Sequence, residues 1–199
     1  MKLFLASANP HKAREFQALA DADGLRVEIA PATAAGGMPA VVEDAGTFLG
    51  NAQKKARALR ARLPAEAWAL ADDSGLCVDA LGGAPGVESA YFAGPKSDDA
   101  ANLRKLIEVM RGVPEARRGA HYLCMLVLAG PAEELVFEGR CDGRLRRDPR
   151  GGGGFGYDPL FLPDGYERTF AELGDEIKNR LSHRARAWAK LAERLRERA

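Results

Sequence analysis

Two adjacent carboxylates, Asp72 and Asp73, follow an apolar run and precede Ser74 and Gly75. Like charges at neighbouring positions repel each other, so the pair needs an explanation. One explanation is a bound Mg2+ ion, which takes one or two protein carboxylates and leaves its other positions to water and substrate phosphates. Its charge would outweigh the repulsion between the two groups. The other explanation is an ordinary solvated turn, and this stretch alone favours the turn.

A second stretch, residues 7–12, has the composition of a phosphate-binding loop between a strand and a helix. Backbone N–H groups at a helix N-terminus point toward a bound anion, and the helix dipole favours it. The stretch lacks the spaced glycines and the Lys-Ser/Thr ending of a P-loop. The alternative is a capped helix with a surface lysine. The residues concerned are Ser7, Ala8, Asn9, Pro10, His11 and Lys12.

A third group of residues surrounds the start of the next expected helix. Thr47 is a candidate N-cap, and Glu43 lies just before that helix, free to ligate a metal together with Asp73. Lys55 follows two turns along and could reach a phosphate. The alternative is that these residues form a solvated basic face of the helix. Neighbouring residues such as Lys54 are expected to lie at least in part on such a face.

Two further groups lie near the C-terminus. The run Phe155-Gly156-Tyr157-Asp158 places two aromatic rings and a carboxylate close together, as in a platform for stacking a base. The alternative is that the rings pack into the core, and at least one is expected to do so. Ser182 is expected to cap the last helix. His183 and Arg184 would then lie in its first turn, where cations oppose the helix dipole, and Lys178 precedes them.

Helical and strand patterns alternate along the chain and predict an α/β fold with a mixed sheet. No internal repeat or linker interrupts the sequence, so residues 1–199 are expected to form one domain. The expected strands are 2–6, 25–30, 68–71 (ending at the Asp pair), 121–128 and 135–141. The expected helices are 10–20, 47–63, one capped by Ser97 that ends near residue 112, and one after residue 182.

Composition excludes several classes of function. Lys and Arg number 29 against 28 Asp and Glu, so charge gives no reason to expect nucleic acid or an anionic membrane as partner. No apolar run approaches the roughly 18 residues of a spanning helix, and the first residues leave no room for a signal peptide. The three cysteines form no CxxC pair, which argues against zinc and disulfides. These features predict a soluble, cytoplasmic protein.

Taken in order, these segments resemble the inosine triphosphate pyrophosphatase family over nearly the whole chain. The matching pieces are Ser7-x-Asn9-x-x-Lys12, Glu43, Thr47-Phe48-x-x-Asn51-Ala52-x-x-Lys55-Ala56, Ala71-Asp-Asp-Ser-Gly-Leu76, Gly82-Gly-Ala-Pro-Gly86, Gly153-Gly-Phe-Gly-Tyr-Asp-Pro159, Thr169, Ala171-Glu-Leu173, Lys178 and Ser182-His-Arg184. Each piece is weak evidence by itself, but all of them in this order are specific. The resemblance favours a metal site at Asp72 and Asp73 over a turn.

The resemblance implies an elongated α/β protein with a mixed sheet, two lobes around a central nucleotide cleft, and a homodimer. It implies Mg2+-dependent hydrolysis of ITP, dITP and XTP to the monophosphate and pyrophosphate. By position, Glu43 and Asp73 would be the metal ligands and Asp73 the general base, with Asp72 in support. Residues 7–12, Lys55 and Ser74 would contact phosphates. Residues expected to enclose the base are Phe155, Gly156, Tyr157, Asp158, Lys178, His183 and Arg184.

The sequence departs from the family pattern in three places. Tyr91 stands where arginine is usual, Glu88 stands where an aromatic is common, and the glycine between Glu43 and Thr47 is shifted by one place. These departures put in doubt a cation near position 91.

Three alternative functions remain open at the level of sequence. A nucleotide sensor without hydrolysis would not need a general base, and a nucleic-acid-binding protein would need more positive charge. A pyrophosphatase for modified pyrimidine nucleotides differs only in its substrate.

Overall fold

The computed structural model of this protein describes residues 1–197. Its elements follow the order β1 (Lys2–Leu5), α1 (Pro10–Ala22), β2 (Glu28–Pro31), α2 (Phe48–Arg60), β3 (Trp68–Val78), α3 (Asp99–Val109), β4 (Gly119–Ala129), β5 (Glu134–Leu145), β6 (Phe161–Pro163), α4 (Phe170–Leu181) and α5 (His183–Arg196). Short 3-10 helices occur at 32–35, 79–81, 86–91 and 115–117. The final two residues of the expected domain, 198 and 199, lie outside the described part of the chain.

The strands form one mixed sheet in the order β2-β1-β3-β4-β5-β6. Strand β1 pairs in parallel with β2 and with β3, whereas β5 and β6 are antiparallel. The chain reverses between β4 and β5 through a short turn in which the Gly130 N–H donates to the Glu133 carbonyl. The predicted mixed α/β sheet flanked by helices is therefore confirmed.

The chain divides into two compact units. Unit 1 contains residues 1–73, 124–139 and the segment from 184 onward, and unit 2 contains residues 74–123 and 140–183. Three strands, β3, β4 and β5, run from one unit into the other.

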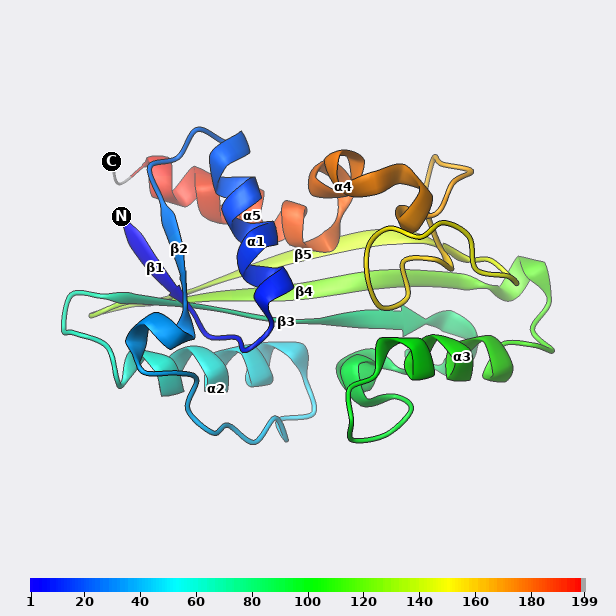
Figure 1. The fold of residues 1–199 in the computed structure, drawn as a ribbon, viewed down its shortest axis with the longest axis horizontal. Helices are drawn as coiled ribbons and strands as arrows, with labels where there is room; N and C mark the ends of the chain where they lie inside the picture. Colours follow the sequence, from blue (N-terminus) through cyan, green and yellow to red (C-terminus); the bar gives the residue numbers. More distant parts are fainter. Residues whose placement is uncertain (198–199) are drawn as a thin grey trace. The chain divides into compact units, whose positions relative to one another are not determined.

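In unit 1, helices cover both faces of the sheet. Helices α1 and α5 lie on one face and α2 lies on the other (Figure 1). Leu70 of β3 packs with the α1 and α5 side chains, whereas Ala69 and Ala71 pack with α2. Successive strand residues point to opposite faces, so Asp72 and Asp73 continue this alternation and point to different faces.

Unit 2 has its own apolar core. Leu76 of β3 and Tyr122 of β4 pack there with Met110 beside α3, Phe161 of β6 and Phe170 of α4. Helix α4 begins with a capping box, in which the Thr169 hydroxyl accepts from the Glu172 N–H and the Glu172 carboxylate accepts from the Thr169 N–H. This helix was not among those expected from the sequence.

Several sequence-based boundaries need correction. Strand β3 does not end at the Asp pair but continues to Val78, because both carboxylates have buried cationic partners. Helix α3 is capped by Asp98, whose side chain accepts from the Ala101 N–H, and not by Ser97. Strand β2 begins at Glu28 and α2 ends at Arg60, inside their expected ranges.

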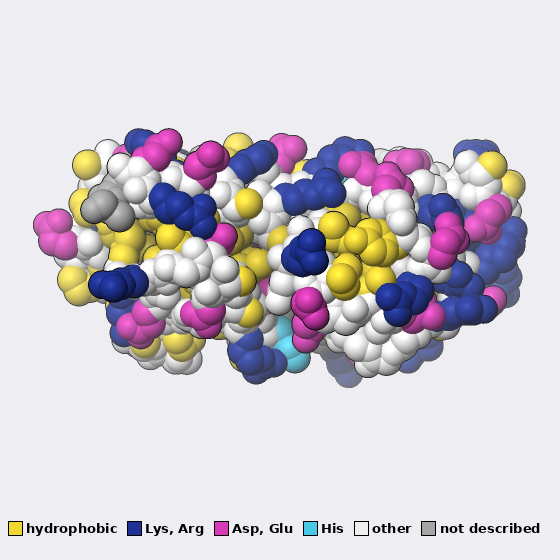
Figure 2. Space-filling model, turned by 90° about the horizontal axis from the view of Figure 1, so that it is seen from above, with side chains coloured by type: hydrophobic (Ala, Val, Ile, Leu, Met, Phe, Trp, Pro, Cys, Tyr) yellow, Lys and Arg dark blue, Asp and Glu magenta, His cyan; other side chains and the backbone are white. Residues whose placement is uncertain are grey.

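The three cysteines are buried free thiols. None of the helices within residues 1–197 combines the length and hydropathy of a membrane span. On the face seen in Figure 2, basic side chains gather with acidic ones among them, in keeping with the balanced composition.

Candidate active site

The Asp72–Asp73 pair is buried within β3. Asp72 is 1% exposed and Asp73 is 8% exposed, so the solvated-turn alternative is wrong. The neighbours avoid direct repulsion because they point to opposite faces of the strand, where each meets a different set of cations.

Asp72 lies in a buried chain of alternating charges within unit 1. Lys12 Nζ of α1 is 2.8 Å from Asp72 Oδ1, and Arg184 Nε of α5 donates to Asp72 Oδ2 at 3.1 Å. Arg184 Nη1 also donates to Glu15 Oε2 at 3.0 Å. Burial alone would raise the pKa of Asp72, but the charges of Lys12 and Arg184 outweigh it and hold that pKa well below its usual range. Asp72 therefore stays ionised.

Asp73 has a different environment, formed by α2 and the loop before it. Lys55 Nζ lies 2.6 Å from Asp73 Oδ1 and 3.0 Å from Glu43 Oε2, and Asn51 Nδ2 donates to Asp73 Oδ2 at 3.3 Å. Burial raises the pKa of Asp73 to about 6, although the neighbouring Lys55 charge acts in the opposite direction. A carboxylate with a pKa near neutrality suits the work of a general base.

The positions of Glu43 and Asp73 fit a hard divalent cation. Both carboxylates approach one point, which Lys55 Nζ occupies, so both can reach a shared positive charge. Among residues 1–197, no cluster of three or more His, Cys, Asp or Glu side chains is arranged to hold a metal. A pair of carboxylates could hold Mg2+, which keeps several positions for water and phosphate oxygens.

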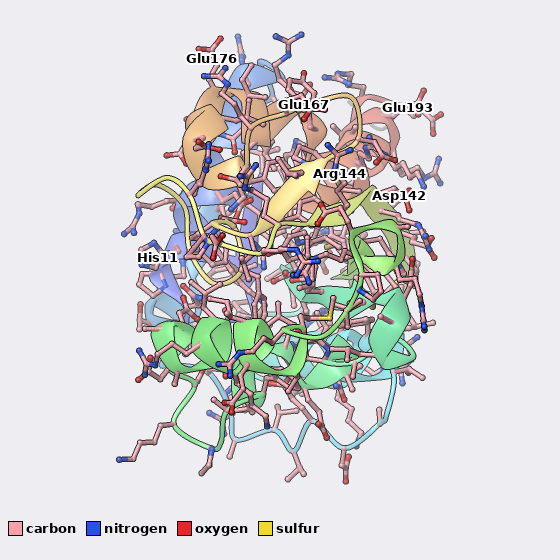
Figure 3. All side chains as sticks on the ribbon, turned by 90° about the vertical axis from the view of Figure 1, so that its right-hand side faces the viewer. His11, Asp142, Arg144, Glu167, Glu176 and Glu193 are labelled. Carbon is pink, nitrogen blue, oxygen red and sulfur yellow. The ribbon has the colours of Figure 1, made fainter. Side chains whose placement is uncertain are left out.

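The stretch 7–12 has the predicted helix-start geometry. The Asn9 side chain caps α1 by accepting from the His11 N–H at 2.9 Å, and the Ser7 hydroxyl accepts from the Asn9 N–H at 3.1 Å. Pro10 occupies the first helical turn. Ala8 and Pro10 are exposed, as is His11, which is labelled in Figure 3. Lys12 points inward to Asp72, so it is not a surface lysine.

A second cluster lies in unit 2, around the aromatic run. Lys178 Nζ of α4 is 2.6 Å from Asp158 Oδ2 and 4.1 Å from the centroid of the Phe155 ring. The Phe155 N–H also donates to Asp158 at 2.9 Å. Tyr157 is buried, and its hydroxyl donates to the Ser89 carbonyl. One of the two aromatics therefore packs into the core, as the sequence indicated.

The predicted residues at positions 74, 156 and 183 lie in unit 2 as well. The buried His183 ring stacks on Tyr122, with ring centroids 4.8 Å apart and planes 10° from parallel. The Gly156 N–H donates to Asp99 at 3.2 Å, and Ser74 is half-buried on β3. Tyr91 and Glu88, the departures from the family pattern, are both exposed.

The structure brings some of the predicted residues together in two groups. In unit 1 these are Lys12, Glu43, Lys55 and Asp73, with Arg184 joined to them through Asp72. In unit 2 Lys178 joins Phe155 and Asp158.

Four residues that contact the predicted ones were not predicted from the sequence: Glu15, Asn51, Asp99 and Tyr122. Asn51 stood inside a quoted motif, and Glu15 follows Lys12 by three residues on a helix, the spacing of side chains on one face. Asp99 and Tyr122 carried no local signal.

The chain is similar to known proteins over almost its whole length. The Ham1 family model matches residues 3–194. The dITP/XTP pyrophosphatase of Opitutus terrae is 64% identical over 198 residues, covering 97% of this chain and 98% of the relative. A solved Ham1 protein from Coxiella burnetii superposes with a TM-score of 0.87 at 36% identity, covering 99% of each chain. The Ham1 protein of Staphylococcus aureus gives 0.87 at 32% identity, covering all of both chains.

Proposed function

Because the chain belongs to the Ham1 family, we propose that it hydrolyses the non-standard purine nucleoside triphosphates ITP, dITP and XTP to the monophosphate and pyrophosphate. This reaction removes deaminated purines from the nucleotide pool. Relatives named dITP/XTP pyrophosphatase cover almost the whole chain. The observation that carries the proposal is the approach of Glu43 and Asp73 to one cation position, beside the charged chain of Lys12 and Asp72.

The proposed cofactor is Mg2+, held by Glu43 and Asp73. When bound, such an ion polarises phosphoryl oxygens and neutralises part of the charge of the triphosphate. Lys55, which pairs with both carboxylates here, is proposed to contact a phosphate when the ion is present. Phosphoryl transfer needs positioning and charge neutralisation more than covalent chemistry, and these residues supply both.

The general base is proposed to be Asp73. Its carboxylate accepts a proton from water as the water oxygen bonds to the α-phosphorus. The bond from that phosphorus to the oxygen bridging to the β-phosphorus breaks, and its electron pair leaves with pyrophosphate. The raised pKa of Asp73 supports this role. Burial holds that pKa at about 6, and a general base works best when its pKa is close to the pH of the reaction.

The remaining site residues divide by the part of the substrate they are proposed to contact. Residues contacting the triphosphate are Ser7, Ala8, Asn9, Pro10, His11, Lys12, Lys55 and Ser74. Residues enclosing the base are Phe155, Gly156, Tyr157, Asp158, Lys178, His183 and Arg184. The buried ion pair of Lys178 with Asp158, beside Phe155, supports a fixed polar and aromatic surface for a base.

Discrimination against ATP is proposed to depend on the 6-position of the purine. Hypoxanthine and xanthine carry an oxo acceptor there, whereas adenine carries an amino donor. The guanidinium group of Arg184 can only donate hydrogen bonds. If the adenine 6-amino group faced it, two donors would meet without an acceptor, which strongly disfavours binding of ATP. Guanine carries the same 6-oxo group, so discrimination against GTP must depend on its 2-amino group.

Three wider expectations accompany this function. We propose that the whole chain acts as one catalytic domain, that it forms a homodimer, and that it works in the cytoplasm, where the nucleotide pool lies. Light scattering during size-exclusion chromatography measures the oligomeric state directly. A monomer at micromolar concentration would contradict the homodimer.

The function is tested with a panel of triphosphates in the presence and absence of Mg2+. We expect pyrophosphate release from ITP, dITP and XTP, little from ATP, GTP or modified pyrimidine nucleotides, and none without a divalent ion. Nucleotide binding without hydrolysis would overturn the proposal in favour of a sensor. A preference for modified pyrimidine nucleotides would overturn the assigned substrate class.

A further inference from the structure

Asn51 has a buried amide side chain that contacts both the loop carrying Glu43 and the Asp73 side chain. It lies on α2 and is 1% exposed. Its Oδ1 accepts from the Ala45 N–H at 3.1 Å, and its Nδ2 donates to Asp73 Oδ2 at 3.3 Å. None of the roles assigned above uses this side chain.

The chemistry of its partners fixes the orientation of this amide. A backbone N–H can only donate, so the atom facing Ala45 must be the amide oxygen. An ionised carboxylate can only accept, so the atom facing Asp73 must be the amide nitrogen. Asparagine is therefore matched to this position, because aspartate would lack the donor and leucine would lack both groups.

The loop that carries Glu43 approaches α2 closely at the same place. A Cβ added at Gly50 would lie 2.5 Å from the Ala45 Cβ, a distance that real side chains do not tolerate. Glu43 is two residues before Ala45. Gly50 thus leaves room for the Glu43 loop to lie against the helix, and the Asn51 amide bonds both to that loop and to Asp73.

We propose that Asn51 is a positioning residue that fixes Glu43 and Asp73 relative to each other, so that both can bind one divalent ion. The inference rests on the proposed function, because it takes these two carboxylates as the metal ligands. Groups that orient metal ligands without touching the metal commonly affect metal affinity by about 10- to 100-fold. Asn51 is expected to act in this range.

The test measures Mn2+ binding to the full chain without nucleotide, by the relaxation enhancement of water protons. Asn51→Leu removes both hydrogen bonds while keeping the branching and the number of side-chain heavy atoms, and it should raise the Mn2+ dissociation constant at least about tenfold. Asn51→Ser is a second variant for the case that leucine prevents folding, since a hydroxyl is too short to reach both partners. It should weaken binding in the same direction.

Asn102 supplies the matched control. It is also a buried helical asparagine, 1% exposed, and it bridges two backbone groups, the Ala93 N–H and the Ala90 carbonyl. Asn102→Leu should lower the melting temperature about as much as Asn51→Leu, because each loses two buried hydrogen bonds. Its Mn2+ dissociation constant should equal that of the parent.

Gly50→Ala tests the loop separately from the amide. Alanine favours a helix over glycine, so the helix itself gains, but the added methyl collides with Ala45. Mn2+ binding should weaken while Asn51 is still present. An unchanged dissociation constant would show that the position of the Glu43 loop does not control the metal.

Glu43→Gln separates failure of the inference from failure of the proposed function. If Glu43→Gln weakens Mn2+ binding and both Asn51 variants bind like the parent, only the inference is overturned. If Glu43→Gln has no effect, or the parent binds no Mn2+, the ligand assignment fails and the inference fails with it.

Discussion

The clusters of unit 1 and unit 2 hold their charges in different surroundings. In unit 1, Asp72 and Asp73 are matched by Lys12, Lys55 and Arg184, and almost every contact joins opposite charges. In unit 2, one ion pair, Lys178 with Asp158, lies against an aromatic ring. Under the proposed function, the unit 1 cluster apart from Arg184 would contact the phosphates and the metal, and the unit 2 cluster would contact the base. Phosphates and metal demand charge neutralisation, whereas a base demands flat apolar faces with a few polar groups.

The same contrast recurs between neighbours inside unit 1. Asp72 and Asp73 are adjacent in sequence, yet their pKa values move in opposite directions. The charges of Lys12, Arg184 and Lys55 hold the pKa of Asp72 low, whereas burial raises that of Asp73 to about 6. A permanently ionised carboxylate organises cations, and a carboxylate that titrates near neutrality can accept a proton. Under the proposed function, the strand face on which each carboxylate lies would separate a structural role for Asp72 from a catalytic role for Asp73.

The largest expected effect concerns Asp72 and stability. Asp72→Asn leaves the buried cations Lys12 and Arg184 without their shared carboxylate, so the free energy of unfolding should fall by about 3–5 kcal/mol. Urea denaturation at pH 7 measures it. The control is Glu167→Gln, which removes an exposed pair with Arg144 (Figure 3) and should cost less than about 1 kcal/mol. Equal effects would contradict the structural role of Asp72.

Asp73→Asn should instead affect turnover. It keeps the shape of the side chain but removes the charge that a base and a metal ligand need. We expect kcat for ITP to fall about 100-fold or more, at saturating Mg2+ and with the fold intact. Near-normal turnover of this variant would show that Asp73 is not the general base. The proposed difference in role between Asp73 and Asp72 would then be wrong.

The pH dependence of stability should show opposite signs for the two neighbours. In metal-free protein the folded-state pKa of Asp73, about 6, lies above the unfolded value of about 3.9. Its stabilising contribution is present below pH 4 and is lost as pH rises through 6, by at most about 3 kcal/mol. The contribution of Asp72, whose pKa is lowered, is present above pH 4 and is lost at lower pH.

Unfolding free energies measured from pH 3 to 8 check these signs. The parent should lose stability relative to Asp73→Asn between pH 4 and 6, and it should gain stability relative to Asp72→Asn as pH rises from 3. Parallel curves for parent and Asp73→Asn would mean that the pKa of Asp73 is not raised.

The smallest expected effects compare ligand binding at the two clusters. The probe is inorganic tripolyphosphate, a competitive inhibitor that resembles the triphosphate of ITP but carries no purine base. Lys12→Ala removes a charge-assisted contact and should weaken both ITP and tripolyphosphate roughly tenfold. Phe155→Leu removes a stacking face and should raise KM for ITP roughly tenfold with the inhibition constant of tripolyphosphate unchanged. If both variants affected the two ligands alike, the division into phosphate and base clusters would be wrong.

Local patterns predicted the parts of the fold that depend on neighbouring residues. Pro10 and Thr47 marked the starts of α1 and α2, and the spacing of apolar residues gave the last helix. Helix α4 was missed because Gly174, with non-helical backbone angles, interrupts it. The continuation of β3 through Asp72 and Asp73 was not predicted, because a buried strand is expected from a run of apolar residues and two charged residues interrupt that pattern.

Long-range partners explain the rest. Arg184 and Asp72 are 112 positions apart, and no local signal shows that they meet. Local sequence singled out Glu43 and Lys12 as candidates, and the family resemblance implied their roles. It did not indicate that Asp72 and Asp73 face different partners, since that follows only from the strand alternation and the helices packed on each face.

The most direct test of the central claim follows the oxygen of the attacking water. ITP is hydrolysed in 18O-labelled water with Mg2+, and the products are analysed by mass spectrometry. Attack at the α-phosphorus predicts one labelled oxygen in the monophosphate, unlabelled pyrophosphate, and no orthophosphate. Label in the pyrophosphate, or orthophosphate as the product, would contradict the account.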